Sequence, residues 1–275
     1  MPYFAYTTEN PFRVLSLGGG VQSTVMALLA DAGRIEGGGP DIAIHADTQW
    51  DPPSTLATVR WLASSVGFPV QVVTQGSLFE HIEAASDEGG FVQAPLFSVD
   101  DRGRKGMGAR QCTYNYKLRP LYRASRAAAG AKPYQNLPPG SIEHWIGIST
   151  DEVSRMKDSR ERWQKARWPL IELGMSRDDC RAYWDEHAPP GAPPLERSAC
   201  VGCPLHSQDD WVRMFERWPE QAAEAVRLDE KIRHAAPGRT QYLHQARIPL
   251  RQAVQRDDLE AGDMMELECE GMCGV

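Results

Sequence analysis

Short apolar runs alternate with amphipathic stretches through the first half of the chain. The apolar runs predict β-strands at residues 12–17, 41–46, 70–73 and 143–148. The stretches between them carry apolar residues at helical spacing and predict helices at residues 22–32, 54–66 and 117–129. Strands and helices in this alternation are typical of right-handed βαβ units. The pattern therefore predicts an α/β fold with a Rossmann-like parallel sheet flanked by helices.

Other stretches interrupt this alternation. Residues 87–108 are rich in glycine and predict a flexible insertion, whereas residues 168–171 predict a short strand. A helix is expected to begin at Ser176, where Asp179 completes an imperfect capping box.

A proline-rich stretch divides the chain. Residues 188–194 read APPGAPP, which predicts a stiff linker. We therefore expect a nucleotide-binding α/β domain over residues 1–187. Residues 195–275 are expected to form a smaller helical region that carries cysteines, with one or two helices between residues 207 and 235.

Composition places the chain among ordinary globular proteins. It has 275 residues, of which 41% are hydrophobic and 24% charged, and this excludes disordered, collagen-like and coiled-coil classes. The mean hydropathy is −0.47, and no apolar run approaches the roughly 20 residues that a membrane span requires. The amino-terminal residues lack the pattern of a secretory signal, so a cytoplasmic location is expected.

The net charge is −7, which is unusual for a protein that coats nucleic acid. Residues 102–126 nevertheless contain eight basic residues and no acidic one, whereas residues 257–270 contain seven acidic residues and no basic one. Either run can be solvated surface. The basic run also suits a mobile loop that closes over a polyanion such as ATP.

Three consecutive glycines follow the first predicted strand. Glycines between a strand and a helix let backbone N–H groups and the helix N-terminus face an anion. The spacing differs from a P-loop and from the dinucleotide fingerprint, and a plain turn is the alternative. The residues expected to hold a phosphate group here are Ser16, Gly18, Gly19, Gly20, Gln22, Ser23 and Thr24.

Six cysteines offer metal or redox chemistry. Cys200 and Cys203 form a CxxC turn, which can be half of a metal site, a dithiol pair or an accident. With further thiolates, such a turn can hold a [4Fe–4S] cluster or a structural zinc ion, and spacing does not choose between them. Cys180 lies on the apolar stripe of a predicted helix and is expected to be buried and inert.

Five segments in order resemble the PP-loop ATP pyrophosphatases, or adenine nucleotide alpha hydrolases. Residues 18–23 (GGGVQS) resemble their SGGxDS loop, with Gly18 in place of Ser and Gln22 in place of Asp. Residues 47–55, 110–120, 147–155 and 168–171 resemble segments of the branch that contains phosphoadenosine phosphosulfate (PAPS) reductase-like proteins. Gln22 in place of Asp resembles the form of the loop in that branch. The resemblance runs from about residue 12 to residue 204.

The resemblance implies further site residues. Asp47, Thr48, Gly147 and Arg155 are expected to contact the nucleotide, and Asp47 could orient a ribose, a Mg²⁺ ion or an attacking group. Members of this family carry [4Fe–4S] clusters on a cysteine that matches Cys112 and on the later CxxC. The resemblance thus implies a cluster on Cys112, Cys200 and Cys203, with zinc as the less favoured metal. Cys273 is the expected fourth ligand, because Gly271 and Gly274 let the backbone approach, and Cys269 is the runner-up.

The leading functional hypothesis is an ATP-dependent, iron–sulfur sulfurtransferase that adenylates its acceptor and releases pyrophosphate. The catalytic candidates are Asp47, Lys117, Arg119 and Cys269, of which Cys269 would carry or resolve a persulfide. One alternative is a sulfonucleotide reductase that acts on PAPS or adenosine phosphosulfate. Another is a non-catalytic nucleotide-binding protein.

The expected partners follow from this chemistry. ATP with Mg²⁺ is the expected nucleotide, and the acceptor can be tRNA, DNA or a small molecule. A desulfurase-type protein is the expected sulfur donor. No membrane partner is expected, and a homodimer is left open.

Overall fold

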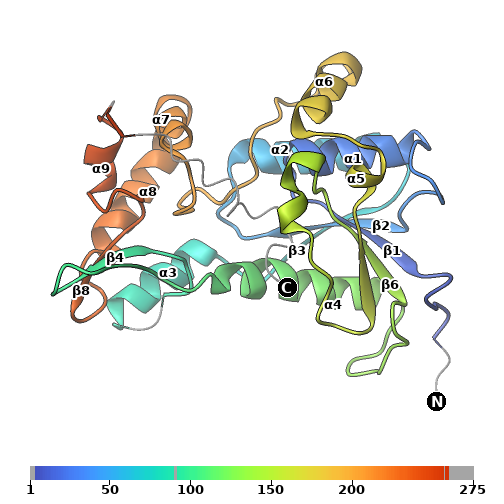
Figure 1. The fold of residues 1–275 in the computed structure, drawn as a ribbon, viewed down its shortest axis with the longest axis horizontal. Helices are drawn as coiled ribbons and strands as arrows, with labels where there is room; N and C mark the ends of the chain where they lie inside the picture. The colour runs from blue at the N-terminus through green and yellow to red at the C-terminus, as the bar shows by residue number, and fades with distance from the viewer. Residues whose placement is uncertain (1–3, 90–91, 257, 260–275) are drawn as a thin grey trace.

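A five-stranded sheet forms the centre of the larger lobe of the molecule (Figure 1). The computed structural model describes residues 4–89, 92–256 and 258–259. All neighbouring strands in the sheet are parallel, in the order β3-β2-β1-β6-β7. The strands are β1 (Phe12–Ser16), β2 (Ile42–Asp47), β3 (Val70–Thr74), β6 (Ile142–Trp145) and β7 (Gln164–Arg167). The α/β fold class predicted from the sequence is therefore confirmed.

Helices cover both faces of this sheet (Figure 1). Leu15 packs in a cluster with the helices of one face, whereas its neighbour Val14 packs in a cluster with the helix of the other face. Both side chains are fully buried, as expected for a parallel sheet that is covered on two sides. One face carries α1 (Val21–Asp31), α2 (Pro53–Ser65), α5 (Pro169–Glu172) and α6 (Arg177–His187), and the other carries α4 (Arg119–Ala128).

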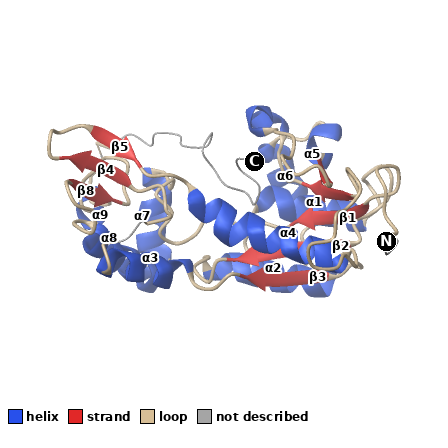
Figure 2. Cartoon of the chain, turned by 90° about the horizontal axis from the view of Figure 1, so that it is seen from below, coloured by secondary structure: helices blue, strands red, loops and turns tan. Residues whose placement is uncertain are grey.

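A second, smaller lobe lies at the other end of the molecule (Figure 2). It contains an antiparallel sheet in the order β5-β4-β8. Leu96 and Leu243, which flank β4 and β8, belong to one apolar cluster with the surrounding helices. The elements of this lobe are α3 (Leu78–Asp87), β4 (Phe97–Asp100), β5 (Lys105–Met107), α7 (Gln208–Arg217), α8 (Pro219–Ile232), β8 (Arg239–Tyr242) and α9 (Leu250–Ala253). The chain therefore enters the smaller lobe twice: α3, β4 and β5 come before the last two strands of the parallel sheet, and the other elements come after them.

The prediction of a flexible insertion at residues 87–108 is wrong for residues 97–107. These residues form a hairpin of β4 and β5, and β4 pairs on its other edge with β8. The partner strand lies about 140 residues further along the chain, and a local reading of glycine content has no access to such a pairing.

The strand expected at residues 168–171 is also wrong. Pro169 begins the short helix α5, where its fixed φ angle suits the first helical turn. The strand β7 lies just before it, at residues 164–167. The expected strand at 143–148 is present but ends at Trp145. The capping box of Ser176 and Asp179 is confirmed.

Hydrogen bonds hold the segment between α6 and α7 in place near its carboxyl end. Ser207 caps α7 and exchanges hydrogen bonds with Asp210 in a capping box. The Asp210 carboxylate also accepts a hydrogen bond from Arg197, which fixes the chain just before the CxxC turn. The domain boundary expected at residues 188–194 stays a prediction.

No helix among residues 4–89, 92–256 and 258–259 combines the length and the apolar character that crossing a membrane requires.

We expect Asp210→Asn to lower the free energy of unfolding at pH 7 by about 2 kcal/mol, because a charge-assisted hydrogen bond is lost. Burial opposes ionisation of Asp210, but the interactions with His206 and Arg197 outweigh it, and the pKa of the carboxyl lies well below its ordinary value. The stabilisation is complete above the unfolded-state pKa of about 3.9 and is lost as the pH falls through the folded-state pKa.

Urea titrations of both proteins at several pH values test this. The stability difference should stay constant from pH 7 to about pH 5 and narrow below about pH 4. A difference that is constant down to about pH 2 would contradict the assignment.

Candidate functional site

The candidate site lies at the carboxyl edge of the parallel sheet. The connection reverses direction between β1 and β6, since β2 and β3 follow on one side and β7 on the other. Ligands of open parallel sheets bind at such a point. Two loops meet there: Gly18–Gly20 leads from β1 into α1, and Gly147 follows β6. Gly20 is the N-cap of α1, and no side chain among the described residues caps this helix.

The glycines of these loops permit close packing. Gly19 has a positive φ of 76°, and a Cβ atom there would lie 2.8 Å from Thr55 Cγ2 on α2. A Cβ atom at Gly147 would lie 3.0 Å from the backbone nitrogen of Ser23. Side chains at either position would push α1 and α2 away from the strand ends, so the loop geometry depends on glycine.

A small polar pocket opens beside the glycine loop, and we call it the hydroxyl pocket. Its walls include Ser16, Gly18, His45, Lys117 and Ser198. The hydroxyl groups of Ser16 and Ser198 are buried and have no hydrogen-bond partner within the described part of the chain. Buried hydroxyl groups in proteins are nearly always hydrogen-bonded, so a ligand atom is the natural partner here.

His45 presents one ring nitrogen to the hydroxyl pocket. Its Nδ1 lies 2.8 Å from the backbone oxygen of Leu17, which can only accept, so Nδ1 carries the proton. Its Nε2 is buried, has no hydrogen-bond partner among the described residues and lies 4.0 Å from the carboxylate of Asp51. The Asp51 carboxylate accepts from the backbone N–H of Thr48. The second ring nitrogen of His45 and the Asp51 carboxylate therefore face the ligand position.

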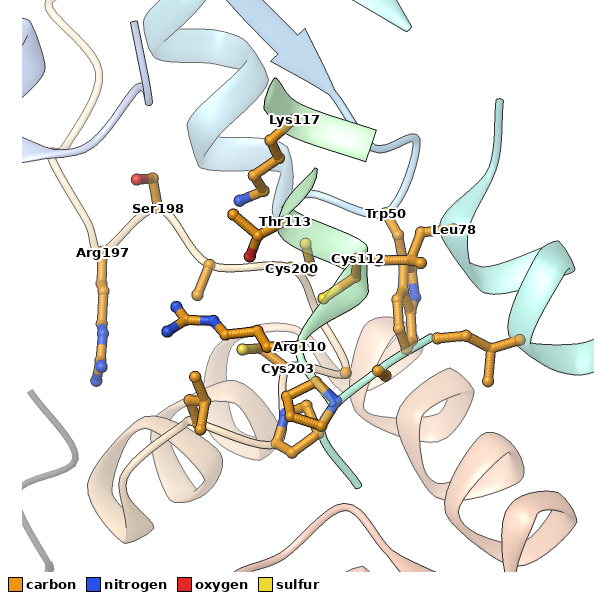
Figure 3. Close-up of a pocket in the computed structure, with 17 residues that line it drawn as sticks. Trp50, Leu78, Arg110, Cys112, Thr113, Lys117, Arg197, Ser198, Cys200 and Cys203 are labelled. Carbon is orange, nitrogen blue, oxygen red and sulfur yellow. The ribbon is translucent and has the colours of Figure 1, made fainter. Parts of the chain in front are cut away.

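Three cysteines surround a second hollow, which we call the thiol pocket (Figure 3). Cys112 precedes the π-helix η1 (Thr113–Leu118), and Cys200 and Cys203 lie on the CxxC turn. The Cys200 thiol is buried and lies 3.4 Å from the Thr48 hydroxyl at the end of β2. Burial raises the pKa of this thiol well above its ordinary value, and the charge of Lys117 opposes that shift.

The CxxC turn is fixed against the sheet through Trp50. The Val201 backbone N–H donates to the Trp50 oxygen at 2.8 Å, and His206 donates from Nε2 to the Cys200 oxygen at 3.0 Å. A Cβ atom at Gly202 would lie 1.9 Å from Trp50 Cη2. The turn therefore requires glycine at position 202 in order to rest on the indole ring.

Lys117 connects the two pockets. It lies on η1, and its side chain and Ser198 line both the hydroxyl pocket and the thiol pocket. π-Helical turns are frequent at functional sites, and here the turn also brings Thr113 to the thiol pocket. A cation thus lies where an anionic group in one pocket would be adjacent to sulfur atoms in the other.

The structure brings some of the predicted site residues together. Ser16, Gly18 and Lys117 line the hydroxyl pocket, and Thr48 contacts Cys200. Other members of the predicted set continue from this loop into α1 or lie against it: Gly19, Gly20, Ser23, Thr24 and Gly147.

Gln22 and Arg155 belong to a separate buried network. The Gln22 amide donates to Glu152 at 2.9 Å, and Arg155 pairs with the same carboxylate. The Arg177 guanidinium also donates to the Glu152 carboxylate, at 2.9 Å. Their side chains line neither pocket within the described part of the chain.

Asp47 and Arg119 also line neither pocket in the described structure. The Asp47 carboxylate accepts the backbone N–H of Gln49, a turn residue with a φ of 54°. Arg119 lines a different surface hollow along α4. Cys269 and Cys273 lie outside the described residues.

Sequence reasoning missed His45, Asp51 and Ser198. The first two flank the Asp47–Thr48 pair, so position after a buried strand was an available signal. Ser198 offered only its proximity to Cys200. Its place opposite Gly18, where an added Cβ atom would lie 3.2 Å from its Oγ, results from the return of the chain after α6.

The donor set of the thiol pocket suits iron or zinc, since both metals bind thiolates. Within residues 4–89, 92–256 and 258–259, no three His, Cys, Asp or Glu side chains are arranged to hold a metal ion. The three cysteines thus share a pocket, and binding would require them to turn toward a common centre.

Comparisons with known proteins find likeness at the level of structure. No protein-family model matches the chain, and no curated protein matches it. The chain is similar in structure to phosphoadenylyl-sulfate (PAPS) reductase from Candida auris, solved as a phosphate complex. The TM-score is 0.42 and the sequence identity 15%, and the likeness covers 66% of this chain and 74% of that one.

We expect Gly202→Ala to displace the CxxC turn, because the new methyl group would overlap the Trp50 ring. Overpacking of this kind costs about 1–3 kcal/mol. Alkylation of the native protein, mapped by peptide mass spectrometry, should show Cys200 protected in the parent chain and reactive in the variant. Gly39→Ala is the matched control, because its Cβ would meet nothing closer than 3.9 Å. Unchanged Cys200 protection in Gly202→Ala would contradict the packing argument.

Proposed function

We propose that this chain is an enzyme that binds an adenine nucleotide in the hydroxyl pocket and performs sulfur chemistry at the thiol pocket. In specific terms, we propose an ATP-dependent sulfurtransferase that adenylates its acceptor. The observation that carries the proposal is the position of Lys117 and Ser198, which line both pockets. A nucleotide phosphate held by them would lie beside Cys112 and Cys200.

The nucleotide step uses groups around the glycine loop. An acceptor oxygen attacks the α-phosphorus of ATP, and pyrophosphate leaves. Backbone N–H groups at the start of α1 and the Lys117 ammonium stabilise the negative charge that develops on the phosphate oxygens. Ser16 and Ser198 donate hydroxyl hydrogens to the phosphate, which satisfies two buried groups.

The sulfur step follows in the neighbouring pocket. A persulfide supplied by a desulfurase-type donor attacks the adenylated carbon through its terminal sulfur, and AMP leaves with the bonding electrons. A second thiol then attacks the resulting disulfide and releases the thiolated product. Cys269 is the proposed carrier or resolving thiol.

A [4Fe–4S] cluster is the proposed resident cofactor, and Cys112, Cys200, Cys203 and Cys273 would hold it. When bound, it supplies iron that can bind sulfur or transfer an electron. The buried contacts of the CxxC turn with Thr48 and Trp50 would keep two of these ligands at a fixed distance from the nucleotide.

A sulfonucleotide reductase is the second candidate, and the same Lys117 geometry favours it. A sulfonate group beside Lys117 would face the thiol pocket directly. A thiolate attacks its sulfur atom and releases adenosine phosphate, and a second thiol then releases sulfite and leaves a disulfide. ATP is not consumed in this reaction, which separates the two candidates.

We expect the full chain, purified without oxygen, to release pyrophosphate from ATP when an acceptor is present. Lys117→Ala should lower the rate about 100-fold, because a cation facing the phosphate charge is lost. Lys105→Ala is the matched control, since that lysine is exposed on β5. Sulfite release from PAPS or adenosine phosphosulfate without ATP turnover would favour the reductase. Nucleotide binding without either product would contradict both reactions.

We expect about four iron and four acid-labile sulfide per chain in protein prepared without oxygen. Cys200→Ala should lose both, whereas Cys180→Ala should keep them, because Cys180 is buried in a different apolar cluster. Metal analysis by mass spectrometry checks this. One zinc per chain, with neither iron nor sulfide, would contradict the cluster and leave the cysteines as a structural clamp.

A further inference from the structure

A basic, aromatic groove lies along α4 on the outer side of the parallel sheet. It is formed by α4, the loop at residues 131–136 and the segment at residues 160–163. Figure 1 shows η1 and α4 as one long green helix beneath the sheet. The groove and its adjoining hollow contain six basic residues, Arg119, Arg123, Arg126, Lys132, Arg160 and Arg162, against one acidic residue, Glu161. This excess of positive charge stands out in a chain whose net charge is −7.

Two aromatic side chains of the groove are unusually exposed. Tyr134 is 101% exposed and Tyr114 is 55% exposed, and both line the groove. Tyr134 also has a φ of 60°, a conformation that bulky residues rarely adopt. The turn that holds it is fixed, because Gln135 accepts from the Lys132 backbone and from Arg126. The protein thus holds an aromatic ring in water with a strained backbone.

The basic side chains of the groove differ in how many interactions they form with other residues of the protein. Arg126 stacks over Trp163 and supports the turn, and Arg123 donates to Gln75. The Arg119 side chain forms no hydrogen bond or ion pair with any residue that the structure describes. Lys132 is exposed. The groove therefore has charge to offer an anion without breaking an internal pair.

We propose that this groove binds single-stranded nucleic acid. Positive side chains that follow a backbone, combined with exposed aromatic rings on which bases stack, are the features that such strands require. A base pair would hide its faces inside a duplex, whereas Tyr134 needs an exposed face. Binding in this groove does not depend on the proposed sulfur transfer. Only the idea that the bound strand is the acceptor rests on the proposed function.

The position of η1 supports this second role. Thr113 and Lys117 face the thiol pocket, while Tyr114 of the same helix lines the groove. A strand in the groove would pass behind the helical segment that carries Lys117, and its end would need to turn around η1 to reach the thiols.

Fluorescence anisotropy tests the proposal on the full chain with its metal content intact. The probes are labelled dT and rU strands of about 20 nucleotides and a duplex of equal length. We expect both strands, or one of them, to bind more tightly than the duplex. Arg119→Ala combined with Lys132→Ala should weaken binding and reduce the slope of log affinity against log salt by about 1.4, from two contacts at about 0.7 each.

The ring of Tyr134 is tested separately. Tyr134→Asn should weaken single-strand binding about tenfold, whereas Tyr134→Phe should retain it. Asn tolerates a positive φ, so the turn is expected to keep its shape. Arg102→Ala combined with Lys105→Ala is the matched charge control, because both residues are exposed near the β4–β5 turn. Absent single-strand binding at low salt, equal duplex binding, or equal losses in the control would overturn the proposal, and none of these readouts depends on ATP or sulfur transfer.

Discussion

The ring of Trp50 and the bare backbone of Gly202 occupy adjoining space, and this contact sets the thiol pocket relative to the sheet. Trp50 follows β2, whereas Gly202 belongs to a segment that returns after α6. The hydrogen bond between Val201 and Trp50 and the contact between Cys200 and Thr48 join the same two segments. The sulfur atoms thus take their position from the strand whose end also bears His45. A change in this contact would displace the thiol pocket relative to the hydroxyl pocket without altering the residues that line either one.

The substitution of Gln for Asp in the loop motif has a structural reason. Gln22 is buried and donates to Glu152, a carboxylate that also binds Arg155 and Arg177. An Asp at position 22 would bring a second negative charge into this enclosed network and remove a donor. The amide therefore suits its neighbours, and it ties the start of α1 to the segment after β6. The same network explains why Arg155 is directed away from the hydroxyl pocket.

The alternation of strands and helices could be predicted because each βα unit is local in sequence. The β4–β8 pairing could not, since its strands are far apart in the chain and carry no distinctive pattern. The acids after β2 show the same limit on a smaller scale. Asp47 and Asp51 lie four residues apart, and only the left-handed turn at Gln49 decides that Asp47 binds the backbone while Asp51 faces the pocket. Spacing identifies candidate residues, but the turn decides their orientation.

The helical segment from η1 through α4 separates two environments of opposite character. On one side Lys117 lines the pockets of the buried Cys200 thiol and of the buried Ser16 and Ser198 hydroxyls, where a single charge has a strong effect because water is scarce. On the other side Arg119 and Lys132 lie in water, where each charge is screened and several are needed to hold a polyanion. Lys117 and Arg119, which both belong to the basic run at residues 102–126, are thus two kinds of cation that composition alone cannot separate. Exposure distinguishes them: the half-buried lysine suits chemistry at one atom, and the exposed residues suit attraction along an extended chain.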